Sequence, residues 1–376
     1  MKLGFYAYDV GPASNLAALA KVFAGEAVIA PPQQPGAALA LLPRFNECDA
    51  LVVGLASFQT EQELDLIERL RPEVPVFVYE DVPGTCSRPK VRDRGLFGRF
   101  AAVLSALPGV YWRDETLKLG YRHAVYLGPP VHWGRLYAAM TSPRVATLRE
   151  QLFAPVAPVF FFAGIKNPEV VNDILEALAP VLRHCRGRLA FRPHPGEEPR
   201  EPLPLPTDAS EDLKVIHRRE AKRYREEKEH YDRALSRRRD LLAEVPTVDV
   251  DGVIARGEAS FSEIAAAANV PVFTGGATDS IIAAYARVAA IYYDYPEAAE
   301  NLRRQCLIGD GRWFVPELGG SYRASSSDEL RDAAERILAG AGELRQSQEQ
   351  NFPIPATWDS ASAALDFIAA RTGLGG

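Results

Sequence analysis

The sequence has little of several features that would indicate particular classes of protein. Its 376 residues include only four cysteines, and no two of these have the C-x-x-C spacing of metal or redox motifs. No apolar run approaches the roughly 20 residues that a membrane-spanning helix needs. No G-x-G-x-x-G fingerprint follows the first predicted strand, which disfavours a dinucleotide dehydrogenase. The formal net charge of -6 argues against nucleic acid as the partner of the whole chain.

These absences set the expectations for the rest of the chain. The N-terminal apolar run stops at Asp9 and is too short for a signal peptide, so a cytoplasmic protein is expected. The scattered cysteines fit reduced thiols, and neither a metal ion nor an organic cofactor is expected. Hydrophobic residues make up 47% of the chain and charged residues 24%, as in a soluble globular protein, and the length favours two domains.

Strand-like and helix-like segments alternate along both halves of the chain. In the first half, helical segments such as 61–71 separate short apolar runs at 3–8, 27–30, 50–55, 74–79, 101–104 and 124–130, the last ended by Pro129-Pro130. In the second half, similar runs lie at 159–163, 189–192, 247–253, 270–274 and 287–293, and Pro180 is expected to kink or divide the helix between the first two. Such alternation predicts an α/β fold with doubly wound parallel sheets.

The stretch Arg192-Pro193-His194-Pro195 ends one of the predicted strands. Both prolines have a fixed φ and lack an N–H, so the residue before each stays extended and the imidazole of His194 has little freedom. Ligands bind at the carboxyl ends of strands in open parallel sheets, and an imidazole held there suits a phosphate oxygen. The alternative interpretation is a proline-stiffened turn with an exposed histidine.

Two adjacent carboxylates, Glu80 and Asp81, end another predicted strand just before Pro83-Gly84. Successive side chains of a strand point to opposite faces, so only one of the two faces a given side. A carboxylate at this position is suited to take a proton from a hydroxyl group as a general base. The alternative interpretation is that Asp81 caps the turn at Pro83-Gly84.

Two glycine turns in the second half have the features of phosphate sites. One carries Gly164 and Lys166 before a predicted helix, and the other has the sequence Gly275-Gly276-Ala277-Thr278-Asp279-Ser280. Glycine lets the backbone approach a ligand closely, and backbone N–H groups at a helix N-terminus attract anions. The hydroxyl groups of Thr278 and Ser280 lie at that terminus. The alternative interpretation is a capped glycine turn that binds no ligand.

The segment 217–240 differs from its surroundings, because it contains ten lysines and arginines against six acidic residues and few apolar positions. It is predicted to form a solvated helix or helical hairpin within an insertion that spans 200–246. Its excess of positive charge also suits contact with an anionic membrane surface or an acidic acceptor.

The order of these motifs resembles the carboxyl-terminal half of GT-B-fold glycosyltransferases and of the related nucleotide-sugar 2-epimerases. The pairing of Glu80-Asp81 with Arg192-Pro193-His194-Pro195 and the loop 275–280 is most similar to bacterial sialyltransferase and polysialyltransferase families. The resemblance implies two Rossmann-like domains that face a cleft, at 1–140 and 156–350. It also implies a C-terminal helix within 351–376 that crosses back to the first domain.

The resemblance further implies an activity and roles for individual residues. The activity is metal-independent transfer of a sugar from a CMP- or UDP-linked donor to a hydroxyl group of a glycan or another acceptor. Asp81, beside Glu80, is implied to be the general base, and His194 to bind the donor phosphate and stabilise the departing nucleotide. The other implied donor contacts are Gly164, Lys166, Arg192, Gly275, Gly276, Ala277, Thr278 and Ser280.

One departure from the resemblance concerns nucleotide binding. Many GT-B enzymes have a glutamate for the ribose hydroxyls where this chain has Ile281-Ile282-Ala283-Ala284, and an isoleucine cannot accept those hydrogen bonds. If a nucleotide is bound, Glu258 or Glu263 is expected to replace that glutamate. Two alternatives therefore stay open: a nucleotide-sugar 2-epimerase or hydrolase, and a non-catalytic binding protein or partner subunit.

Overall fold

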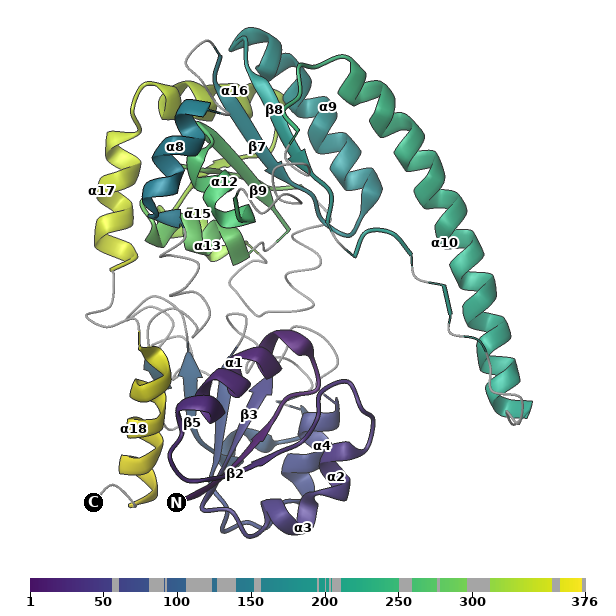
Figure 1. Cartoon of the computed structure of the whole chain (residues 1–376), viewed down its shortest axis with the longest axis vertical. Helices are drawn as coiled ribbons and strands as arrows, with labels where there is room; N and C mark the ends of the chain where they lie inside the picture. The colour runs from purple at the N-terminus through teal and green to yellow at the C-terminus, as the bar shows by residue number, and fades with distance from the viewer. Residues whose placement is uncertain are drawn as a thin grey trace.

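The computed structural model contains two α/β units, each built around one parallel sheet (Figure 1). The residues that the structure describes are 1–55, 61–80, 91, 93–105, 124–126, 140–151, 157–194, 196–199, 201–202, 204, 211–249, 259–275, 278–295, 312–353 and 359–373.

The first sheet has the strand order β2-β1-β3-β4-β5-β6, and every neighbouring pair is parallel. One face packs against α1 (Val10–Val22) and α18 (Ser360–Thr372), and the other packs against α2 (Ala37–Ala40), α3 (Leu42–Phe45) and α4 (Glu61–Arg69). Its strands are β1 (Lys2–Tyr6), β2 (Glu26–Ile29), β3 (Ala50–Leu55), β4 (Val76–Glu80), β5 (Phe100–Ser105) and β6 (Ala124–Tyr126), with a 3-10 turn, η2 (Leu96–Arg99), before β5.

The second sheet has the order β11-β10-β9-β7-β8 and is also parallel throughout. One face packs against α9 (Pro168–His184) and α16 (Ser327–Leu338), and the other against α8 (Pro143–Gln151), α12 (Phe261–Ala267), α13 (Thr278–Tyr285) and α15 (Phe314–Glu317). Its strands are β7 (Val159–Ala163), β8 (Arg188–Arg192), β9 (Val270–Thr274), β10 (Ile291–Tyr293) and β11 (Tyr322–Ala324). Helices on both faces of both sheets confirm the predicted α/β class and the doubly wound sheets.

The last two helices belong to different units. α17 (Gly342–Asn351) contributes Leu344 to the core of the second unit, whereas α18 contributes Ala364 and Ile368 to the core of the first. The chain therefore returns to the first sheet, where α18 packs beside α1 (Figure 1). None of the helices in the described parts of the chain has the length and apolar character that a membrane span requires.

Three local predictions from the sequence can be compared with the structure. α9 runs through Pro180 as one helix, so the predicted division of that helix is wrong, and its apolar face packs in the core while Pro180 itself faces solvent. Of the strand expected at 247–253, Thr247 forms only an isolated bridge with Leu189, and residues 250–253 lie outside the described part of the chain. The charged segment lies within one long and mostly exposed helix, α10 (Glu211–Ala243), which confirms the predicted helix and excludes the helical hairpin, and α10 packs on α9.

A buried carboxylate lies at the carboxyl ends of β1 and β3 in the first sheet. Glu63 of α4 is fully buried, and its Oε1 accepts a hydrogen bond from the N–H of Tyr8 at 2.5 Å. Its Oε2 has no hydrogen-bond partner among the described residues, and neither has the buried hydroxyl of Tyr6. Burial raises the pKa of Glu63 to about 7, even though the N–H groups of Tyr8 and of Glu63 itself oppose the shift.

The pKa of Glu63 makes the stability of the protein depend on pH. Because the folded state binds this proton more tightly than the unfolded state, the stabilisation is present below the unfolded pKa and is lost as the pH rises through about 7. Glu63→Gln keeps an acceptor for Tyr8 and removes the titration. Urea unfolding should show that between about pH 5 and about pH 8 the parent loses on the order of 2 kcal/mol relative to the variant. Parallel curves for the two proteins would contradict this expectation.

Candidate functional site

The strand order of the second sheet indicates where a ligand can bind. β7 lies between β8 and β9, and the chain leaves β7 toward a helix on one face, α9, and leaves β9 toward a helix on the other, α13. Ligands of open α/β sheets bind at the carboxyl ends of the strands at such a reversal of order. Gly164 follows β7, His194 follows β8 and Gly275 follows β9. The fold thus brings three of the predicted segments to one edge.

Glycine allows a close approach where the ends of β7 and β8 meet. The N–H of Gly164 donates to the carbonyl of Arg192 at 2.9 Å. A Cβ at position 164 would lie 3.2 Å from that carbonyl oxygen and 3.2 Å from the backbone nitrogen of His194, which is too close for ordinary packing. The short contact places the histidine turn directly beside the segment that carries Lys166.

The turn after β9 is also shaped by glycine. Gly275 has a left-handed φ of +63°, and a Cβ there would approach Ile165 Cγ2 to 3.3 Å. This contact joins the turn after β9 to the turn after β7. Both turns therefore lie at the same end of the sheet, and α13 begins at Thr278 directly behind them.

The imidazole of His194 is held as a neutral hydrogen-bond donor. The N–H of Gly196 donates to Nδ1 at 2.9 Å, so the proton of the neutral ring is on Nε2. Burial and the nearby charge of Lys166 lower the pKa of His194, and Glu197 opposes them. A Cβ at Gly196 would lie 3.4 Å from the ring and 3.5 Å from Lys166 Cε, so the two side chains flank one glycine. Together they offer an N–H and an ammonium to an anion.

Asp279 is a residue of this edge that the sequence analysis did not select. It lies in the first turn of α13, and burial raises its pKa to about 6 while the charge of Arg192 acts in the opposite direction. The sequence Gly-Gly-Ala-Thr-Asp-Ser places a carboxylate near a helix N-terminus, which is the signal that could have pointed to Asp279. A carboxylate in that position is also a common helix cap, so the pattern alone did not distinguish the two roles. In the structure it lies within the electrostatic reach of Arg192, which ends β8 on the other side of β7.

Two residues proposed from the sequence have structural roles instead. The hydroxyl of Ser280 is fully buried and accepts a hydrogen bond from Trp313 Nε1 at 2.9 Å, so it is in the core and not at the edge. Glu263 forms a capping box at the start of α12, where its Oε2 accepts from the N–H of Ser260 at 2.8 Å and from its hydroxyl at 2.9 Å. It is therefore not free to replace the missing ribose glutamate.

The structure describes only some of the remaining predicted residues. Glu80 ends β4 as a buried residue in register with Ser105. Asp81, Glu258, Gly276 and Ala277 lie outside the described residues, and for Thr278 only the backbone is described. Within the described ranges, no group of three or more His, Cys, Asp or Glu side chains could hold a metal ion.

Comparison with known proteins shows the fold of the chain and does not identify its activity. No protein-family model matches the chain, and no curated protein matches it. Among solved structures, UDP-GlcNAc 2-epimerase of Methanocaldococcus jannaschii, in complex with UDP-GlcNAc and UDP, has 12% identity, a TM-score of 0.53 and coverage of 98% of this chain and 100% of that one. MurG of Acinetobacter baumannii has 12% identity, a TM-score of 0.53 and coverage of 98% and 99%. A glycosyltransferase of Rickettsia africae has 10% identity, a TM-score of 0.51 and coverage of 98% of both chains. The chain therefore has the two-domain GT-B fold over nearly its whole length.

The protonation of His194 can be measured directly. We expect its ring proton resonances to titrate below the ordinary histidine value of about 6.5, because burial and Lys166 both disfavour the imidazolium. Lys166→Met should raise the pKa of His194, whereas Lys21→Met, in the first unit, should leave it unchanged. The measurement is an NMR pH titration, with the His194 signal assigned by its loss in His194→Ala. A midpoint above 6.5 in the parent protein would contradict this assignment.

Proposed function

We propose that this protein transfers a sugar from a nucleotide-sugar donor to a hydroxyl acceptor, with the donor bound at the carboxyl edge of the second sheet. The observation that carries the proposal is the pairing of a neutral His194, with its proton on Nε2, and Lys166 at the point where the strand order reverses. An N–H donor and an ammonium suit a phosphate group. The GT-B fold, which the chain shares with a glycosyltransferase and a UDP-GlcNAc 2-epimerase, supports this proposal.

Sugar transfer needs a base at the acceptor hydroxyl and positive charge at the donor phosphate. The acceptor oxygen forms a bond to the anomeric carbon while the bond from that carbon to the donor phosphate breaks, and the nucleotide leaves with the electron pair. Asp81 is proposed to take the proton of the acceptor hydroxyl. Negative charge grows on the phosphate, where Lys166, the Nε2–H of His194 and the N-terminus of α13 would stabilise it. No metal ion is needed for this division of roles.

We assign to Asp279 the role of accepting hydrogen bonds from donor hydroxyls. The nucleotide needs such an acceptor because Ile282, at the usual position of the ribose glutamate, is buried and apolar. Asp279 is three residues earlier on the same helix, close to Arg192. In this proposal residues 1–140 bind the acceptor and residues 156–350 bind the CMP- or UDP-linked donor.

A nucleotide-sugar 2-epimerase is the second candidate, because an epimerase whose structure holds UDP-GlcNAc has the same fold over 98% of this chain. It would convert a donor in the absence of any acceptor. A binding protein without catalytic activity would hold the nucleotide and leave the sugar–phosphate bond intact. Donor turnover, measured with and without acceptor glycans, separates all three.

Isothermal calorimetry with CMP, UDP and their sugars tests the donor site. We expect one nucleotide to bind at micromolar to millimolar concentration, and His194→Ala to weaken that binding by about tenfold because it removes one hydrogen bond to a charged group. The control is His184→Ala, since His184 is exposed on α9 and pairs only with Glu335 among the described residues. Equal affinities of the two variants would contradict the proposed role of His194.

Asp81→Ala tests the proposed base. It should lower transfer by about two orders of magnitude or more and leave nucleotide affinity unchanged, because the base acts on the acceptor and not on the donor. Asp49→Ala, at the amino end of β3, is the matched control. A fully active Asp81→Ala variant would exclude Asp81 as the base.

The amino-terminal half of α10 is proposed to contact an anionic membrane surface. α10 extends well beyond the body of the second unit (Figure 1), and its exposed surface there carries Arg218, Arg219, Lys222, Arg223 and Arg225. Replacing Arg218, Arg219 and Arg223 by Gln should weaken binding to phosphatidylserine vesicles by about a hundredfold, at roughly 1 kcal/mol for each arginine. Vesicle sedimentation measures this, with the triple Gln variant of Lys21, Arg69 and Arg71 as control. Unchanged sedimentation of the α10 variant would contradict the proposed contact.

A further inference from the structure

One arginine of α10 is buried, unlike most of the charged residues on that helix. Arg238 is 4% exposed, and its guanidinium binds both carboxylate oxygens of Glu197, which is equally buried. The distance from Nη1 to Oε2 is 3.0 Å. Nε donates to Asn172 Oδ1 at 3.1 Å, and Nη2 also donates to the carbonyl of Pro168 at 3.4 Å. The cation further lies 5.4 Å from the centre of the Phe191 ring.

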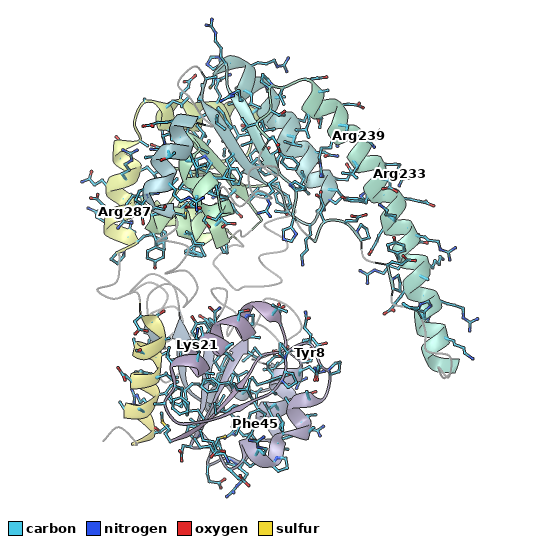
Figure 2. The ribbon with its side chains drawn as sticks, in the orientation of Figure 1. Tyr8, Lys21, Phe45, Arg233, Arg239 and Arg287 are labelled. Carbon is cyan, nitrogen blue, oxygen red and sulfur yellow. The ribbon has the colours of Figure 1, made fainter. Side chains whose placement is uncertain are left out.

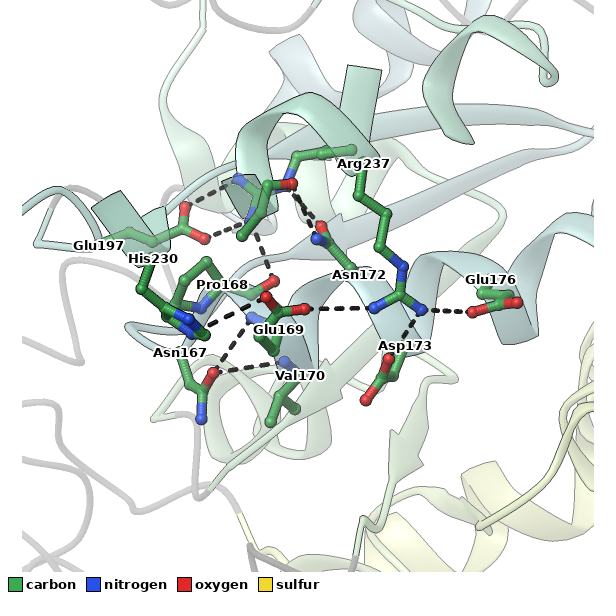
Figure 3. Close-up of polar contacts among 12 residues, drawn as sticks. Asn167, Pro168, Glu169, Val170, Asn172, Asp173, Glu176, Glu197, His230 and Arg237 are labelled. Carbon is green, nitrogen blue, oxygen red and sulfur yellow. Dashed lines mark hydrogen bonds and ion pairs between the residues drawn. The ribbon is translucent and has the colours of Figure 1, made fainter. Parts of the chain in front are cut away.

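Glu197 belongs to the same turn as the histidine. Its N–H donates to the carbonyl of His194 at 3.0 Å, and the N–H of Gly196, between them, donates to Nδ1 of the imidazole. The carboxylate and the imidazole are thus fixed to one short turn. Glu197 connects this turn to α10, and Asn172 connects α10 to α9 through a hydrogen bond from its Nδ2 to the carbonyl of Ala234 at 2.9 Å (Figure 3).

Arg238 is not needed merely to dock α10 on α9. The adjacent Arg237 makes ion pairs with Glu169 at 3.2 Å, Asp173 at 3.0 Å and Glu176 at 2.5 Å, all on α9 (Figure 3). Those pairs hold the two helices together at the surface. Arg238 also binds Asn172 and Pro168 of α9, but in addition its guanidinium reaches Glu197 in the turn after β8.

A buried ion pair is a costly way to stabilise a protein, because apolar residues of similar volume are often as stable or more so. The pair does determine the orientation of the carboxylate, because a guanidinium that binds both oxygens fixes the plane and position of that group. Here the carboxylate that it fixes is three residues from His194. The contact therefore constrains the turn more than it stabilises the fold.

We propose that Arg238 is a positioning residue that holds the imidazole of His194 in place through Glu197. The inference rests on the proposed function of His194 in binding the donor phosphate. In this proposal α10, the long charged helix between β8 and α12, holds the turn that carries His194 in position. Without this contact, the turn would lose its connection to the buried guanidinium of α10.

The charged groups around His194 determine how the proposal is tested. Lys166 faces the ring from the turn after β7, and Glu197 faces it from its own turn. Arg238 neutralises Glu197, and Tyr231 of α10 lies within electrostatic reach of the same carboxylate. Lys228 pairs with the neighbouring Glu198 at 3.1 Å. Removal of Arg238 leaves Glu197 as an uncompensated negative charge beside the imidazole.

The decisive experiment compares Arg238→Met with Arg239→Met, a change at the next, exposed position of the same helix (Figure 2). NMR titration of His194 in the free protein should show that Arg238→Met raises the pKa of His194 by about one unit, because an unpaired carboxylate favours the imidazolium. Arg238→Lys, which keeps the charge, should restore most of the original value. Arg239→Met should have no effect. An unchanged His194 titration in a folded Arg238→Met protein would overturn the proposal.

A double variant covers the case in which a lone buried carboxylate prevents folding. Arg238→Met combined with Glu197→Met removes both charges and should fold, since apolar replacement of a buried pair is tolerated. This double variant should bind UDP or CMP about tenfold more weakly than Arg239→Met does, because the turn that carries His194 is no longer held by α10. Affinity equal to that of Arg239→Met would overturn the proposal. The titration of His194 needs no nucleotide, so it stays informative even if the protein binds no donor.

Discussion

The close approach of β7 and β8 at their carboxyl ends is the constraint on which the candidate site depends. A hydrogen bond from the N–H of Gly164 to the carbonyl of Arg192 closes that approach, and a Cβ at position 164 would be crowded by the turn after β8. It places the histidine turn against the segment that carries Lys166. Because β9 lies on the other side of β7, the turn at Gly275 joins the same edge. Three loops far apart in the sequence thereby form one surface suited to an anion.

The electrostatics of that surface favour a neutral donor beside a charged one. A protonated imidazole next to an ammonium would repel it, and the lowered pKa of His194 avoids this repulsion. The hydrogen bond from Gly196 sets the tautomer, so Nε2–H is the group presented. Asp279, in the first turn of α13, has a pKa that burial raises to about 6, and the positive charge of Arg192 opposes that shift. The edge is therefore arranged for one anionic group together with neighbouring hydroxyls.

The sequence predicted the features that depend on local pattern. Runs such as 50–55 and 159–163 became buried strands, and the glycine turns and the His-Pro stretch met at one edge because the alternation of strands and helices determines where strand ends lie. Features that depend on distant partners were missed. Ser280 was read as a free hydroxyl, yet its partner is Trp313, and Glu263 was read as a ligand group, yet it caps its own helix. Arg238 looked like one more charge on a solvated helix because its partner, Glu197, is 41 residues away.

The central claim is that the donor phosphate binds at the carboxyl edge of the second sheet. A crystal structure of the protein with the nucleotide that calorimetry identifies tests it most directly. The account predicts a phosphate oxygen within hydrogen-bonding distance of His194 Nε2 and of Lys166 Nζ, with the N-terminus of α13 facing the same group. A phosphate bound at the edge of the first sheet, with His194 in contact only with protein or water, would contradict it.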